Sequence, residues 1–329
     1  MKLGFKSKKL TALSTIGFAR WSMLYRVPSG VSKGVARPLR RPFVLFETNF
    51  NGDSDQYLES FALVVPKAMN RVWNHAYEVP NVERVSEWLT HVNKEKLPIA
   101  AYYCAYPGAT VKMIRSALAL QRLLPRFRNE VPAMSGKQFE VKFRGLLAGV
   151  QRIRNPDSNT TAQTGRVTTL IPVPADRKAQ LHRDLGALAS PAASMPEGTH
   201  FARWCVIDQV RYEDDPTSYL LFSAWFDGDA ADKYLKAMYD ELGAKRANDI
   251  WGACDFAGND AETFAKFLLR YKVDPGSEFA GYNGVTVAEV LAALDVSERF
   301  HKFAVDSQSA SKKTLSLKDA WLSDPVLKG

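Results

Sequence analysis

The chain has 329 residues, of which 46% are hydrophobic and 24% are charged, and its formal net charge is +9. This length is comfortable for two domains, and the composition is that of a globular protein rather than a disordered or fibrous one. No apolar run approaches the ~18 residues that a membrane-spanning helix needs, so we expect no transmembrane segment. The cysteines are too few and too scattered for a disulfide framework or a zinc site, and they favour a reducing, cytoplasmic location. They are Cys104, Cys205 and Cys254.

The positive charge is concentrated near the N-terminus. Residues 1–46 hold ten basic residues and no acidic residue, whereas the rest of the chain holds 34 basic and 35 acidic residues. Such an asymmetry is typical of proteins that meet an anionic partner, and it predicts a basic N-terminal arm. The lysines at the start of this arm are Lys2, Lys6, Lys8 and Lys9.

The sequence pattern of one pair of strands occurs twice in the chain. Phe-Ala-Arg-Trp stands at 18–21 and again at 201–204, and each copy opens an apolar, strand-like run. A second apolar run follows at 43–46 and at 219–222. Because a strand points successive side chains to opposite faces, we predict two equivalent strand pairs with alternating faces. Internal repetition of this kind indicates a duplicated architecture.

Each predicted strand pair ends in the same kind of turn. Phe-Asn-Gly-Asp at 50–53 matches Phe-Asp-Gly-Asp at 226–229, and the glycine in each turn supplies a positive φ. We expect Asp53 and Asp229 to cap the helices that follow, because aspartate accepts bonds from the free amides of a first helical turn. Apolar residues at helical spacing then predict one buried stripe on each helix. The stripes are Tyr57, Leu58, Phe61, Ala62 and Val65, and Tyr234, Leu235, Met238, Tyr239 and Leu242.

Further landmarks after these helices extend the repeat. Trp73 and Trp251 follow at similar distances, and we predict that they are equivalent core or interface residues. Cys-Ala-Tyr-Pro-Gly at 104–108 is matched, more weakly, with Cys-Asp-Phe-Ala-Gly at 254–258. A short strand is predicted at 251–256, so that a strand and a helix would close the second half.

The order of elements in the second half is strand, helix, strand, strand, helix, strand, which is the order of the ferredoxin-like fold. The first half lacks an opening strand and helix, unless residues 139–153 supply them. We therefore predict an α+β protein, a tandem pseudo-duplicated ferredoxin-like sandwich with two sheets and helices packed on one face of each. The predicted divisions are 1–154 for the first half with its basic arm, 155–305 for the second half and 306–329 for a tail anchored by Trp321.

Three segments of the second half carry a resemblance to known proteins. They are His-Phe-Ala-Arg-Trp at 200–204, Leu-Leu-Phe at 220–222 and Phe-Asp-Gly-Asp at 226–229. With them the chain resembles uncharacterised bacterial ferredoxin-like proteins, which are similar in layout to the dimeric α/β-barrel superfamily. That superfamily includes dye-decolorising peroxidases and chlorite-dismutase-like heme proteins, so the resemblance implies heme chemistry as an alternative. The Gly-x-x-Asp-Gly heme motif of the peroxidases is absent from both halves, and no cofactor is predicted.

Three residues are candidates for chemistry: His200, Arg203 and Asp229. Arg203 falls on a strand face that is otherwise apolar, where it could polarise a bound peroxide or carboxylate. The alternative is a structural role, in which Arg203 pairs with a carboxylate such as Asp229 or Glu47, and its recurrence as Arg20 favours that role. The sequence contains no phosphate-binding loop, nucleophile elbow or zinc signature.

A basic helix is predicted at 110–124. Lys112, Arg115 and Arg122 cluster on one side of it, and Arg126 follows just beyond its end. An apolar stripe bordered by cations is the pattern of a helix that lies on anionic lipid, whereas the alternative is the solvated flank of an ordinary core helix. The stripe consists of Val111, Ile114 and Leu118.

Two functions of different classes remain open from the sequence. The leading hypothesis is a non-catalytic or accessory protein that docks on an acidic protein partner or an anionic membrane surface through its basic first half. It would be cytoplasmic, with peripheral attachment to the membrane as one form. The alternative is a small-molecule enzyme, heme-dependent and peroxidase-like, with a cavity between sheet and helices. Nucleic acid is a poorer fit because the aromatic residues alternate as strand core, and a homo-oligomer is compatible with the sequence.

Overall fold

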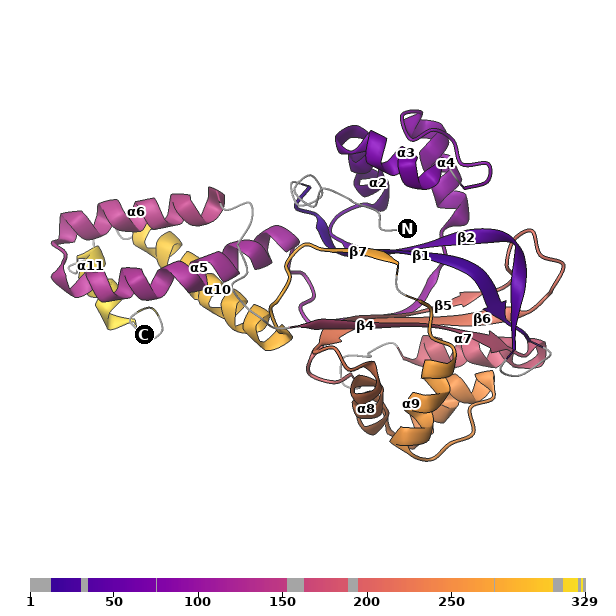
Figure 1. Cartoon of the computed structure of the whole chain (residues 1–329). Helices are drawn as coiled ribbons and strands as arrows, with labels where there is room; N and C mark the ends of the chain where they lie inside the picture. Colours follow the sequence, from indigo (N-terminus) through magenta and orange to yellow (C-terminus); the bar gives the residue numbers. More distant parts are fainter. Residues whose placement is uncertain are drawn as a thin grey trace.

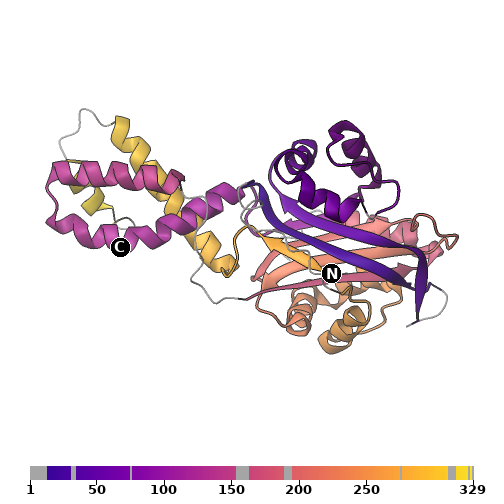
Figure 2. The same ribbon diagram turned by 45° about the horizontal axis from the view of Figure 1, so that its top comes forward.

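The structure, a computed structural model, describes most of the chain. The described residues are 13–30, 35–74, 76–152, 163–188, 195–274, 276–309, 316–324 and 327. They form an α+β protein in which two antiparallel sheets lie face to face, with helices on both outer faces (Figure 1). A helical arm projects from one end of this sandwich, as the turned view in Figure 2 also shows.

The first sheet has the strand order β2-β1-β7. Its strands are β1 (Ile16–Pro28), β2 (Ala36–Phe50) and β7 (Ser277–Ala280). Its outer face is covered by α2 (Ser54–Val64), α3 (Pro66–Trp73) and α4 (Val85–Glu95). Because neighbouring side chains of a strand point to opposite faces, Trp21 packs under these helices while Arg20 reaches the other sheet.

The second sheet has the strand order β3-β5-β6-β4. Its strands are β3 (Ile99–Cys104), β4 (Thr164–Val173), β5 (Thr199–Ile207) and β6 (Ser218–Asp227). Its outer face is covered by α7 (Lys178–Ala187), α8 (Ala231–Trp251) and α9 (Ala261–Arg270), with short 3-10 helices η2 (Ala175–Arg177) and η4 (Gly252–Cys254). Trp204, Phe222 and Trp251 are fully buried and in ring contact, and they form the centre of this layer.

Each sheet receives one edge strand from the other half of the chain. β3 pairs antiparallel with β5 of the second sheet, and β7 pairs antiparallel with β1 of the first sheet. The two registers agree, since Tyr103 lies opposite Ala202 in one pair and Phe279 lies opposite Ala19 in the other. This exchange brings the segments that follow β3 and β7 to the same end of the sandwich.

The helical arm begins at that end of the sandwich. Its helices are α5 (Val111–Glu130), α6 (Gly136–Arg152), α10 (Val287–Ser309) and α11 (Leu317–Ser323), and η1 (Val131–Ala133) follows α5. α5, which follows β3, packs against α10, which follows β7. Trp321 is 1% exposed and touches the rings of Phe127, Phe139 and Phe300, so the predicted anchoring role of Trp321 is confirmed.

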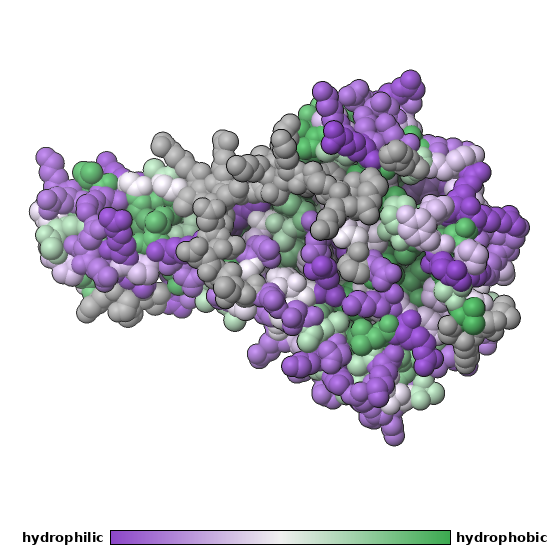
Figure 3. Space-filling view, viewed as in Figure 1, coloured by the Kyte–Doolittle hydropathy of each residue, from purple (hydrophilic) through white to green (hydrophobic). Residues whose placement is uncertain are grey.

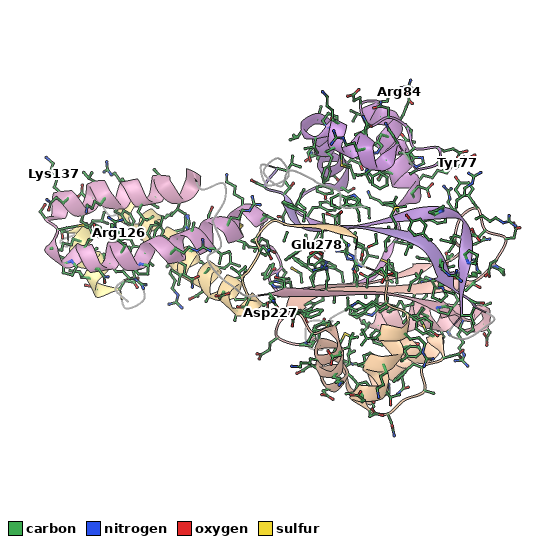
Figure 4. All side chains as sticks on the ribbon, viewed as in Figure 1. Tyr77, Arg84, Arg126, Lys137, Asp227 and Glu278 are labelled. Atoms are coloured by element: carbon green, nitrogen blue, oxygen red, sulfur yellow. The ribbon has the colours of Figure 1, made fainter. Side chains whose placement is uncertain are left out.

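Charged groups are buried between the two sheets. Arg20 Nη1 donates a hydrogen bond to Thr168 Oγ1 at 2.6 Å, and Thr168 Oγ1 donates to Glu47 Oε2 at 3.1 Å. Arg20 Nη1 lies 4.0 Å from Glu47 Oε2, and burial lowers the pKa of Arg20 while Glu47 acts in the opposite direction. Arg166 pairs with Glu278, which Figure 4 shows in the space between the sheets. The inner faces are therefore joined by ion pairs as well as by apolar contacts.

The two predicted turns differ in how they cap the next helix. Asp53 accepts hydrogen bonds from the amides of Asp55 at 2.8 Å and Gln56 at 3.1 Å, as predicted. The prediction that Asp229 caps α8 is wrong: Asp229 is exposed, and Ala230 holds the capping position without a side-chain bond. The reason is that α8 begins one residue later, relative to its turn, than α2 does.

Two other predicted elements are also corrected. The strand expected at 251–256 is absent, because α8 continues to Trp251 and η4 follows it. Residues 139–153 do not supply an opening strand, since Phe139, Phe143 and Val150 lie buried along α6 at helical spacing. Both errors arose where a short apolar segment suits a strand and a helix equally well.

Candidate functional site

A pocket with a cavity volume of about 460 Å³ opens at the end of the sandwich that carries the arm. The ends of β1, β2 and β3 and the first turn of α5 surround it. Two amide side chains, Asn49 and Asn51, contribute polar groups, and no described residue that lines the pocket carries a charged side chain. The aromatic lining consists of Phe50, Tyr102, Tyr103, Tyr106, Phe201 and Tyr282.

Two matched segments meet at this end of the molecule. Tyr-x-Gly-x-Thr-Val occurs at 106–111 and again at 282–287, directly before α5 and α10. The glycines, Gly108 and Gly284, have φ of 82° and 68°, a region that favours glycine because a side chain would clash with the backbone. The threonine in each segment accepts a bond from the first turn of its helix, at 3.1 Å in α5 and 3.2 Å in α10. Each tyrosine is therefore held at a fixed distance from a helix N-terminus.

The turns at the ends of β2 and β6 hold these helix starts in place. Asn51 Oδ1 accepts a hydrogen bond from the amide of Val111 at 2.7 Å. Asp227 occupies the matching position and accepts from the amide of Val287 at 3.0 and 3.2 Å. A helix N-terminus favours a negative charge, so α10 stabilises the carboxylate of Asp227. Figure 4 shows Asp227 at the end of the second sheet that faces the arm.

A chain of buried polar groups runs from Asp227 to the pocket. His200 Nε2 lies 3.0 Å from Asp227 Oδ1, and His200 Nδ1 lies 2.9 Å from the Tyr106 hydroxyl. The Tyr106 hydroxyl is 2.7 Å from the hydroxyl of Tyr282. His200 is 0% exposed and both tyrosines are 4% exposed. Burial raises the pKa of Tyr106 and of Tyr282, so both phenols are neutral at physiological pH.

Gly17 occupies the position in the first half that His200 occupies in the second. Both residues stand directly before Phe-Ala-Arg-Trp, and their carbonyls accept matching bonds from Gly281 at 2.6 Å and Ala105 at 3.1 Å. A Cβ atom at position 17 would lie 3.8 Å from the Tyr282 hydroxyl. Tyr106 therefore has an imidazole partner, whereas the Tyr282 hydroxyl lies beside Gly17, and both Gly17 and Tyr282 line the pocket.

The three residues predicted from the sequence to take part in chemistry lie at different places in the structure. His200 belongs to the buried polar chain. Arg203 donates to the carbonyl of Thr48 at 3.0 Å and to Asn49 Oδ1, so it supports one wall of the pocket rather than pairing with a carboxylate. Asp229 is exposed in its turn, and the carboxylate beside His200 is that of Asp227, two residues earlier. The prediction of Asp229 as a site residue is thus corrected to Asp227.

Sequence reasoning missed Tyr106, Tyr282 and Gly17. The match proposed between 104–108 and 254–258 hid them, since the segment that repeats Tyr-Pro-Gly-Ala-Thr-Val is Tyr-Asn-Gly-Val-Thr-Val at 282–287. The identical spacing of tyrosine, glycine, threonine and valine was the signal that could have identified both tyrosines.

The residues predicted to bind an anionic surface are only partly available. Lys112, Arg122 and Arg126 are exposed on α5, and Figure 4 shows Arg126 and Lys137 on the arm. Arg115 is 2% exposed and its Nε donates to the carbonyl of Gly281 at 2.7 Å, so its assignment to a surface is wrong. The predicted apolar stripe, Val111, Ile114 and Leu118, is likewise buried, in contact with the sandwich and α10. Residues Lys2, Lys6, Lys8 and Lys9 lie outside the described residues.

The donor set of the pocket does not fit a heme. Among the described residues that line it there is no histidine, and the ring nitrogens of His200 face Tyr106 and Asp227. Cys104 and four tyrosines line the pocket, but burial raises the pKa of the thiol and of all four phenols, and so disfavours the thiolate or tyrosinate that iron would bind.

No protein-family model, curated protein or solved structure matches the chain. Within the described ranges, no helix is both long and apolar enough to cross a bilayer. Nor do the described side chains include a group of three or more histidine, cysteine, aspartate or glutamate residues that could hold a metal ion.

Proposed function

We propose that the protein binds a small, uncharged aromatic molecule in the pocket beside Gly17. The observation that carries this proposal is the difference between two matched positions. At position 200 an imidazole meets a buried tyrosine hydroxyl, whereas at position 17 a glycine puts no side chain against the corresponding hydroxyl of Tyr282, and both Gly17 and Tyr282 line the pocket. A polar group at the wall of an otherwise apolar cavity is the usual means by which a site orients its ligand.

The lining determines the class of ligand. Six aromatic rings favour a flat, apolar ring system, because aromatic pairs stack or meet edge to face. A ligand that enters the pocket already charged would lose its hydration without gaining an ion pair from the described lining, and that loss is costly. The volume of about 460 Å³ is that of an ordinary small-molecule site.

The arrangement of the two sheets suggests how the fold arose. We propose that the chain is a tandem duplication of a ferredoxin-like unit with exchanged edge strands, in the layout of the dimeric α/β-barrel superfamily. Phe50 stacks on Tyr57 and Phe226 stacks on Tyr234, each pair at 4.0 Å and 6°, which supports a common origin for the two halves. In such a pair the two halves differ at the pocket, where the first half has Gly17 and the second half has His200.

Filling the pocket from position 17 tests the proposed binding. Gly17→His should place an imidazole against the Tyr282 hydroxyl and exclude the ligand. Gly17→Ala is the matched control, because its Cβ meets the same carbonyl of Asn49, at 3.3 Å, but adds no ring. Thermal shift with a panel of uncharged aromatic fragments that includes 4-nitroanisole should show binding to the wild type and Gly17→Ala only. Absence of binding to the wild type, or equal binding to Gly17→His, would refute the proposal.

A second candidate function follows from the charge on the arm. We propose that the arm docks on an acidic protein partner through a basic arm face, defined by its exposed cations on α5 and α6. These are Lys112, Arg122, Arg126, Lys137, Lys142 and Arg144. Only Glu130 and Glu140 oppose them on these two helices, and Glu130 is already paired with Arg126 and Lys142. Figure 3 shows hydrophilic residues with apolar patches between them on the viewed side of the arm. A protein is favoured over a membrane because the apolar stripe of α5 is buried.

Charge reversal tests this docking. Lys112→Glu, Arg122→Glu and Lys137→Glu together should abolish binding to poly-L-glutamate in low salt. The control reverses an equal charge on α8 and α9 at Lys233, Lys245 and Lys266, which are also exposed, and it should keep most of the binding. Binding should weaken as salt shortens the screening length from ~10 Å at 0.1 M to ~3 Å at 1 M. Equal loss in both variants, or no salt-sensitive binding, would contradict the proposal, and binding only to phosphatidylserine vesicles would replace the protein with a membrane.

A further inference from the structure

Two tyrosine hydroxyls connect the pocket to a histidine that no ligand can touch directly. His200 is completely buried, and the described groups around its ring are the Tyr106 hydroxyl, the Asp227 carboxylate and the ring of Phe18 at 5.6 Å. An imidazole buried next to a carboxylate is costly unless both ring nitrogens have polar partners. Tyr106, which follows β3, hydrogen-bonds Nδ1, whereas Asp227, at the end of β6, places its carboxylate 3.0 Å from Nε2 as an electrostatic contact without hydrogen-bond geometry.

The Asp227 carboxylate determines which atoms carry the protons in the row of hydrogen-bonded side chains. The negative charge of the Asp227 carboxylate, whose Oδ1 lies 3.0 Å from Nε2, favours the His200 tautomer that carries its proton on Nε2 and leaves Nδ1 as an acceptor. The Tyr106 hydroxyl then donates to Nδ1 at 2.9 Å, and its oxygen accepts from the Tyr282 hydroxyl at 2.7 Å. A hydroxyl has one donor and two acceptor positions, so the Tyr282 oxygen still has acceptor capacity on its Gly17 side.

We propose that the pocket takes an aromatic ligand with an acidic hydroxyl, a phenol or an enol, and that Tyr282, Tyr106 and His200 relay the proton of that hydroxyl. This inference rests on the proposed function, because it requires an aromatic ligand beside Gly17. The ligand hydroxyl donates to the Tyr282 oxygen. As the ligand O–H bond breaks, that proton binds Tyr282, the Tyr282 proton moves to Tyr106, and the Tyr106 proton forms an N–H bond at His200 Nδ1.

The charges balance across this step. The ligand becomes an anion and the His200 ring becomes a cation, while both tyrosines end as neutral phenols. The cation forms beside the Asp227 carboxylate, which α10 holds through the amide of Val287. No oxidant or reductant takes part, and the return of the proton along the same path restores the starting state. The site would therefore activate a hydroxyl as a nucleophile or an enolate without exposing the base to water.

A spectroscopic probe separates the relay from simple binding. 4-Nitrophenol changes its visible absorbance when it ionises, whereas 4-nitroanisole has nearly the same shape and no acidic proton. In the full-length wild type, at a pH where free 4-nitrophenol is mostly neutral, we expect the ratio of ionised to neutral bound probe to rise by about tenfold over the free probe, the change that ~1 pH unit represents. His200→Gln should bind the probe in its neutral form.

A second variant covers the case in which His200→Gln fails to fold. Tyr106→Phe keeps the ring and interrupts the relay in the middle, so the 4-nitrophenol that it binds should stay in the neutral form, and the ratio of ionised to neutral bound probe is compared whatever the affinity of the variant. If the wild type binds 4-nitroanisole but does not ionise 4-nitrophenol, or if Tyr106→Phe ionises it equally, the relay is wrong and the binding proposal stands. If the wild type binds neither probe, in a full titration of each, both proposals fail.

Discussion

Removing the Arg20 guanidinium from between the sheets should destabilise the sandwich strongly. In Arg20→Met the apolar stem stays, but Glu47, which is 5% exposed, loses the charge 4.0 Å away. Two unit charges at that distance attract by ~4 kcal/mol at an effective dielectric constant of ~20. Thr168 also loses the donor at 2.6 Å. Since breaking a buried pair leaves an uncompensated charge, we expect the free energy of unfolding to fall by about 3–5 kcal/mol.

The double variant shows whether the pair itself is responsible. Arg20→Met with Glu47→Leu removes both charges, and it should recover most of the loss seen in Arg20→Met alone. The assay is urea unfolding at neutral pH followed by tryptophan fluorescence, with an unchanged slope as the sign that only stability changed. A control cycle uses Arg299 and Asp295, an exposed pair on α10 at 3.1 Å, whose coupling should stay near ~0.5 kcal/mol. If the coupling of Arg20 with Glu47 is no larger than that of the surface pair, the reasoning fails.

Three further outcomes are expected. Trp251→Ala should lower the free energy of unfolding by about 3–5 kcal/mol, because the ring is 0% exposed and touches three other rings. An unchanged melting temperature would contradict the place of Trp251 in the core. Cys104 should react with iodoacetamide before Cys205, because burial raises the pKa of the Cys205 thiol to about 11. The rate at Cys104 should rise with pH as its thiolate forms. If mass spectrometry shows the reverse order, the position of Cys104 at the pocket is wrong. The hydrogen bond from the amide of Gln56 lowers the pKa of Asp53, so the charged cap stabilises the fold above the unfolded pKa and is lost as pH falls through the folded one. The melting temperature of Asp53→Asn should therefore fall less than that of the wild type between about pH 6 and about pH 3, and parallel curves would argue against the cap.

Local features of the fold were readable from the sequence because neighbouring residues determine them. Alternation around 18–21 and 201–204 predicted strands that the structure contains, and Asp53 caps the helix that follows its turn. Trp251, predicted to be a core or interface residue, is fully buried, whereas its predicted equivalent Trp73 is half-buried. For the strands and the cap the deciding interactions lie within a few residues, where spacing along the chain reflects distance in space. The short segment at 251–256 was the exception, because its length and polarity suit a strand and a helix turn equally.

The candidate site was beyond such reasoning because its parts meet only in the folded chain. Tyr106 is 94 residues from His200 and 176 from Tyr282, and the exchanged edge strands bring them together. Nothing near an edge strand specifies which sheet it joins, since the backbone bonds of a ladder are the same for any partner. The sequence alone determined that position 17 is a glycine where position 200 is a histidine. Only the tertiary structure decided that this missing side chain leaves a pocket, because the Tyr282 hydroxyl that it would have met arrives from the opposite end of the chain.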